Sequence, residues 1–141
     1  MSELKLVKQP KGTNLCGQAC IATIAGVSLD EAVAACSDHK GKTKTWQLVE
    51  ALAFLGVHTD GKLTTIPAKR RDGWANAIVS ILHYVDKANK IEHWMVYDHG
   101  TILDPAGRHT GKTLTDPDIC QHVKSAVAIR DSRLNGYPLP V

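Results

Sequence analysis

The first third of the chain alternates between apolar stretches of helical length and short polar breaks. Cys16 to Ala25 is apolar on nearly every side, which predicts a helix buried in the core. Thr13 or Asn14 is placed to cap its start, and Gly26 is placed to end it. Ser28-Leu29-Asp30-Glu31 reads as a capping box and predicts a second helix that runs to about Ser37.

A polar loop follows over residues 38–44, and the pattern then becomes helical again. Thr45 is placed to cap a third helix from Trp46 to Leu55, and Gly56 follows as its stop signal. Val57 to Pro67 is expected to be mostly extended. The chain thus opens with three predicted helices before its first clear strand.

The second half of the chain favours strands. A strand is predicted over Ala77 to Val85, a hairpin over residues 91–104, and a last strand over Ser125 to Arg130. A short helix from Thr115 to about Lys124 precedes that last strand. Helices first and strands later predict an α+β fold, with one helical layer beside an antiparallel sheet, in a single domain over residues 1–141.

The hairpin places a histidine near a carboxylate. Ile91 to Tyr97 predicts one strand and Thr101 to Asp104 its return, joined at Asp98-His99-Gly100. If Asp98-His99 is the loop, His93 and Asp104 face each other directly; if His99-Gly100 is the loop, they are diagonal neighbours. In either register the two side chains lie within reach of each other. Asp98 is the rival carboxylate, but its place in the turn favours a structural role.

Cys16 stands at the predicted start of the first helix, in the segment Gln9-Pro10-Lys11-Gly12-Thr13-Asn14-Leu15-Cys16-Gly17. Unpaired N–H groups and the dipole of a helix start favour a thiolate, which is the reactive form of cysteine. Gly17 is expected to let a substrate backbone come close. The N–H of Cys16 and the side-chain amide of Gln9 are expected to hold an oxyanion.

A structural interpretation stands beside each of these assignments. Cys16 is equally typical of a buried cysteine in a core, and His93 of a surface histidine on a strand. Six other histidines have no comparable context and are expected to be mostly solvated: His39, His58, His83, His99, His109 and His122.

Taken together, these segments resemble the papain-like cysteine peptidases, most closely the C39-like group. The shared elements are Gln9, Cys16-Gly17-Gln18-Ala19-Cys20, His93-Trp94-Met95-Val96 and Asp104-Pro105-Ala106-Gly107. The resemblance implies a papain-like fold, with a cleft between the helical layer and the sheet. It also implies Cys16 as nucleophile, His93 as general base and acid, Asp104 as the residue that orients His93, and Gln9 as oxyanion donor.

The expected function is that of a cysteine hydrolase, a peptidase that attacks an amide carbonyl of a peptide or protein substrate. The same three residues also serve a protein glutamine deamidase or an acyl transferase, and the fold without turnover serves as a binding module. These alternatives stay open at this stage. The oligomeric state is left open as well.

Composition and charge limit which binding partners and which cellular compartment are expected for the protein. The net charge is only +3, and Lys69-Arg70-Arg71 reads as a solvated loop, so no nucleic acid is expected. Met1 to Pro10 has no apolar signal region and no run approaches a membrane span, so a cytoplasmic protein with reduced cysteines and no membrane partner is expected. The spacing of Cys16, Cys20, Cys36 and Cys120 matches no structural zinc site, so neither a metal nor a cofactor is expected.

Overall fold

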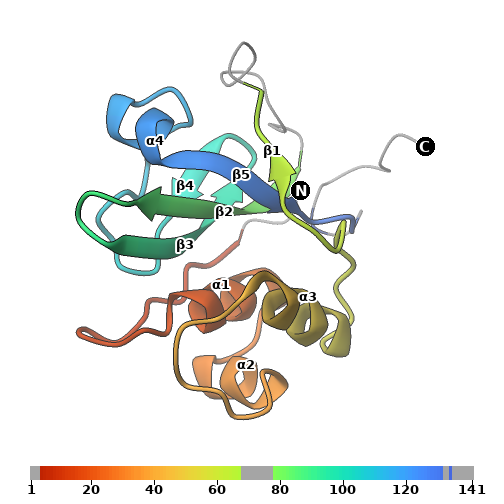
Figure 1. The fold of residues 1–141 in the computed structure, drawn as a ribbon. Helices are drawn as coiled ribbons and strands as arrows, with labels where there is room; N and C mark the ends of the chain where they lie inside the picture. The colour runs from red at the N-terminus through yellow and green to blue at the C-terminus, as the bar shows by residue number, and fades with distance from the viewer. Residues whose placement is uncertain (1–3, 68–77, 132–133, 135–141) are drawn as a thin grey trace.

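Three helices form one layer of the molecule and a five-stranded antiparallel sheet forms the other (Figure 1). The structure, a computed structural model, describes residues 4–67, 78–131 and 134. The strands lie in the order β1-β5-β2-β3-β4. The elements are α1 (Cys16–Ala25), α2 (Leu29–Ala35), α3 (Thr45–Phe54), β1 (Thr64–Thr65), β2 (Val79–Asp86), β3 (Ile91–Asp98), β4 (Thr101–Leu103), α4 (Pro117–His122) and β5 (Val123–Ala128).

The α+β prediction is confirmed, and the helix predictions are close. The helix over Cys16 to Ala25 has the predicted bounds, and Gly26 ends it in the left-handed conformation (φ 71°). The capping box at Ser28 is present, since its side chain accepts from the Glu31 amide. The third helix begins one residue early because Lys44, not Thr45, is the N-cap; the Lys44 amide donates to the Gln47 side chain.

The predicted N-cap of the first helix was wrong. Neither Thr13 nor Asn14 caps α1; the N-cap is Leu15, without a side-chain hydrogen bond. The Thr13 hydroxyl instead donates to the Pro10 carbonyl and closes a turn. Of the segment expected to be extended, only β1 is a strand, with an isolated bridge from Thr59 to Ile129. Ala77 and the Lys69-Arg70-Arg71 cluster lie outside the described residues.

The central strands are covered on both faces, which explains their nearly continuous apolar sequences. Side chains alternate along a strand, so neighbouring residues enter different clusters. Ile81 and Trp94 belong to the cluster beneath α1, whereas Leu82 and Met95 belong to the cluster with Ile119 of α4. α1 therefore packs on β3 as the central helix of the molecule.

Helix α1 is held closely against the loop that follows α2. Gly17 is buried, and a Cβ built there would clash with Thr43 Oγ1 and lie 3.0 Å from Thr43 Cβ. The absence of a side chain thus serves packing against Thr43, and the expectation that Gly17 leaves room for a substrate backbone is wrong. None of the described helices is by itself long and apolar enough to cross a bilayer; α1 and α2 reach the length and composition only as a pair bent by 106°.

Gly17→Ala is expected to destabilise the fold by about 1–3 kcal/mol, because the added methyl group would clash with the buried Thr43 side chain. The gain in helix propensity offsets only part of this cost. Chemical denaturation measures the effect. Adding Thr43→Ala should restore part of the loss, since it removes the nearest atom.

Gly41→Ala is the matched control for this substitution. A Cβ at Gly41 meets only the His39 ring, at an ordinary 3.5 Å, so the free energy of unfolding should change little. Equal destabilisation by the two glycine variants would contradict the packing argument.

Candidate functional site

Cys16 is the first residue of α1 and is only 6% exposed. The first N–H groups of a helix have no partner within the helix, so they and the helix dipole favour negative charge at this position. Cys16 is close enough to His93 that its side chain contributes, by hydrogen bonding and charge, to the raised pKa of the His93 ring. The start of α1 therefore meets the sheet at a thiol–imidazole contact.

The hairpin has the second of the two predicted registers. Asp98 pairs with Thr101, so the loop is His99-Gly100 and His93 is a diagonal neighbour of Asp104. The pairing of β3 with β4 ends at Val96 and Leu103, which leaves His93 beyond the last paired residues. The His93 Nε2 atom lies 2.6 Å from Asp104 Oδ1.

The Asp104 carboxylate is almost fully buried and is held by the turn that follows it. Its Oδ1 accepts from the Ala106 amide at 2.9 Å, and its Oδ2 accepts from the His109 amide at 3.0 Å. The Gly107 amide closes the same turn on the Asp104 carbonyl at 2.7 Å. Two backbone donors thus fix the carboxylate in place, and one of its oxygens also contacts His93.

The electrostatics of the pair favour a charged imidazole beside a charged carboxylate. Burial lowers the pKa of His93, but hydrogen bonds and negative charge from Asp104 and Cys16 outweigh burial and raise it to about 9. Burial raises the pKa of Asp104, but the hydrogen bond and charge of His93, with the amides of Ala106 and His109, bring it below the ordinary value. Asp98, by contrast, lies at the turn and contacts His99 at 2.6 Å, as expected of a structural carboxylate.

Gln9 is attached to the same region through its backbone and its side chain. Its amide donates to the Pro105 carbonyl at 3.0 Å, which ties the segment before α1 to the turn after β4. Its side-chain nitrogen donates to the Thr13 carbonyl at 2.8 Å. Its side-chain oxygen is buried and has no hydrogen-bond partner among the described residues. Gln9 therefore stands next to the Asp104 turn, with one hydrogen of its side-chain amide used within its own loop.

The loop before α3 is a part of the site that the sequence did not reveal. The fully buried Gln18 side chain donates to the carbonyls of His39 and Gly41, at 2.9 and 3.0 Å. The Trp94 indole donates to the Thr43 carbonyl at 3.0 Å. A glutamine and a tryptophan in otherwise apolar segments were the available signal, because a buried polar side chain requires a partner.

The expectation that the other histidines are solvated is wrong for His109, which is 5% exposed and stacks on Tyr84. His83 stacks on Trp94 with ring centroids 4.5 Å apart. His58 is exposed, as expected. The rings of His83 and His109 pack against aromatic side chains of the sheet, whereas His93 lies beside Asp104.

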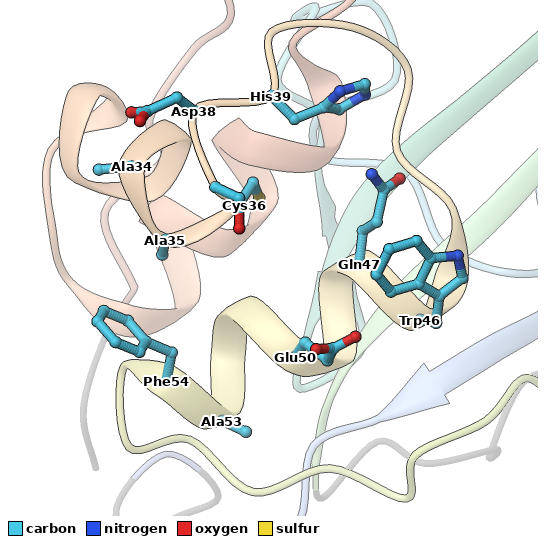
Figure 2. Close-up of a pocket in the computed structure, with 11 residues that line it drawn as sticks. Ala34, Ala35, Cys36, Asp38, His39, Trp46, Gln47, Glu50, Ala53 and Phe54 are labelled. Atoms are coloured by element: carbon cyan, nitrogen blue, oxygen red, sulfur yellow. The ribbon is translucent and has the colours of Figure 1, made fainter.

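A separate groove of about 970 Å³ lies between α2 and α3 (Figure 2). Trp46 and Phe54 stand on its α3 side and are 58% and 80% exposed, with Glu50 between them. Asp38 and His39 bound it from the α2 side. Its lining includes none of Cys16, His93, Asp104 or Gln9, so the groove is distinct from the thiol–imidazole site.

Over the described residues, no group of three or more His, Cys, Asp or Glu side chains is arranged to hold a metal ion. Neither the models of known protein families nor the curated proteins include a match to this chain. The chemistry must therefore be argued from the site itself.

The raised pKa of His93 predicts how stability depends on pH. The folded value of about 9 lies above the ordinary 6.5, so the protonated ring stabilises the fold. This contribution is fully present below pH 6.5 and is lost as the pH rises through about 9. Compared with His93→Gln, the wild-type protein should lose more thermal stability over that interval.

Proton NMR of the His93 ring measures the same property directly. The pH at the midpoint of the His93 titration should lie near 9. It should fall in Cys16→Ala, because that substitution removes one hydrogen bond and one charge that favour the protonated ring. Cys20→Ala is the matched control and should leave the midpoint unchanged. A midpoint near 6.5 in both the wild type and Cys16→Ala would contradict the proposed coupling.

Proposed function

We propose that this protein is a papain-like cysteine hydrolase, a peptidase that cleaves an amide bond in a peptide or protein. The observation that supports this most directly is the His93 ring, whose Nε2 lies 2.6 Å from the buried Asp104 carboxylate and whose pKa is raised in part by the Cys16 thiol at the helix start. A nucleophile, a base and a group that orients the base are the minimum set for covalent catalysis by cysteine.

The proposed reaction has two steps. The Cys16 thiolate, paired with protonated His93, attacks the carbonyl carbon of the amide and forms a C–S bond. As the C–N bond breaks, His93 gives its proton to the leaving amine. His93 then takes a proton from water, which attacks the thioester; the C–S bond breaks, the carboxylic acid is released, and Cys16 leaves as the thiolate paired with protonated His93, as at the start. The net reaction converts an amide and water into an acid and an amine.

Asp104 acts as the residue that orients His93. Its two backbone donors fix the carboxylate, and the 2.6 Å contact selects which ring nitrogen faces away from the thiol. The Cys16 amide and the remaining side-chain hydrogen of Gln9 are the proposed donors to the oxyanion. Gln18 is unsuited to that role because its side-chain amide is committed to two loop carbonyls.

Selective alkylation tests the nucleophile. At pH 6, iodoacetamide should modify Cys16 at least roughly tenfold faster than Cys120, although Cys120 is the more exposed thiol, because ordinary thiols are almost wholly protonated at that pH. Peptide mapping by mass spectrometry gives the rate at each cysteine. Cys16→Ala should also abolish cleavage of a peptide mixture.

His93→Ala should remove this selectivity and the cleavage, whereas His99→Asn should retain both. His99 has a positive φ of 50°, which asparagine tolerates, so the control preserves the turn. Faster labelling of Cys120 in the native wild-type protein would contradict the assignment of Cys16.

Gln9→Ala tests the oxyanion donor. Its kcat should fall by roughly 10²–10³ with little change in KM, since the bond forms mainly in the transition state. The lost bond to Thr13 should cost only about 1 kcal/mol of stability. Asn14→Ala, which removes an exposed amide from the same loop, is the control, and wild-type kcat in Gln9→Ala would exclude Gln9 from the reaction.

A further inference from the structure

Three separate segments adjoin the residues of the thiol–imidazole site, and all three are basic. They are residues 8–15 before α1, residues 39–45 before α3, and residues 105–111 after β4. These segments contain no Asp or Glu. They contain six cationic side chains, every one exposed: Lys8, Lys11, Lys40, Lys42, Lys44 and Arg108. We call this set the basic rim.

Specific contacts bring the three segments to the site. The Gln9 amide bonds to Pro105, which joins the first segment to the third. Thr43 lies against Gly17 and accepts from Trp94, which places the second segment beside Cys16 and His93. The His109 amide, next to Arg108, bonds to Asp104. Each rim residue therefore lies within three positions of a residue that contacts the site.

Positive charge is more concentrated in the basic rim than in the rest of the chain. Six of the 17 Lys and Arg lie on it, so the remaining eleven are outnumbered by the 14 Asp and Glu. Among the described residues, no rim side chain forms an ion pair with a carboxylate. Near the site, Asp104 is engaged with His93, and Glu92 contacts His83 at 3.0 Å.

The charged residues of the groove between α2 and α3 are acidic, in contrast to those of the basic rim. Its charged residues are Asp38 and Glu50, and Lys and Arg are absent from its lining (Figure 2). Carboxylates thus mark the groove, whereas cationic side chains mark the rim beside it. Charges within a Debye length of about 8–10 Å act together at ordinary ionic strength, and such fields raise association rates by roughly 10–10³.

We propose that the site takes an acidic protein segment, in which Asp or Glu residues flank the amide bond that Cys16 attacks. The inference rests on the proposed function and adds the class of substrate to it. The rim attracts the segment and pairs with its carboxylates on either side of the attacked bond. Segments rich in Lys or Arg are repelled by the same field.

Two alkylating reagents of nearly equal size test the field without a known substrate. Iodoacetate carries a negative charge and iodoacetamide is neutral; both form an S–C bond at the thiolate and release iodide. At low salt, the ratio of iodoacetate to iodoacetamide rates should be roughly tenfold higher at Cys16 than at Cys120. The ratio at Cys16 should fall toward that of Cys120 at high salt.

Charge variants locate the source of this preference. The preference of Cys16 for iodoacetate should be mostly lost in a triple variant that carries Lys11→Gln, Lys42→Gln and Arg108→Gln. The control removes three exposed charges elsewhere, Lys5→Gln, Lys62→Gln and Lys87→Gln, and should keep the preference. An equal loss in both variants would show that net charge, rather than the rim, is responsible, and would overturn the proposal.

Two peptide aldehydes test the substrate class. Acetyl-Asp-Asp-Leu-Gly-aldehyde should bind Cys16 at least tenfold more tightly than acetyl-Lys-Lys-Leu-Gly-aldehyde. In the triple variant the two inhibition constants should become nearly equal. Equal inhibition would overturn the proposal. So would protection of Cys16 by a single-stranded DNA oligonucleotide at physiological salt without protection by an Asp-rich peptide, because nucleic acid would then be the ligand.

The outcomes separate the two proposals. If iodoacetamide does not select Cys16, the hydrolase assignment fails and the substrate class fails with it. If iodoacetamide selects Cys16 but charge has no effect on the rates, only the acidic substrate is excluded.

Discussion

The burial of the Asp104 carboxylate is the constraint on which the rest of the site depends. A carboxylate in a closed environment is costly unless hydrogen bonds and an opposite charge compensate it. Here the amides of Ala106 and His109 supply the bonds and the His93 ring supplies the charge. Because the ring is needed there for stability, its position beside Asp104 follows from the fold itself.

The same reasoning explains why the polar groups around α1 are placed as they are. Gln18 and Trp94 lie in the core and must find acceptors, and the loop over residues 39–43 provides them. Gly17 then permits that loop to approach the helix. The wall of the site is thus fixed by buried hydrogen bonds and close packing, whereas its outer surface remains free to carry charge.

Local signals made the helices and the hairpin predictable. The capping box at Ser28 and the glycine after α1 depend on neighbouring residues alone, and both were recognised from the sequence. The contact between His93 and Asp104 was predictable because a hairpin has only a few registers. The roles of Gln18 and Thr43, the burial of His109 and the missing side-chain cap of α1 depend on residues far apart in the chain, so no local pattern specified them.

The contact between Gln9 and Pro105 has a consequence for the life of the chain in the cell. The groups of the site come from the beginning, the middle and the far part of the sequence, and this contact joins the earliest of them to the latest. During synthesis, Cys16 emerges long before His93 and Asp104 and is at that stage an ordinary thiol. The interaction between Cys16 and His93 therefore forms only after the chain as far as Asp104 and Pro105 has been made and has folded.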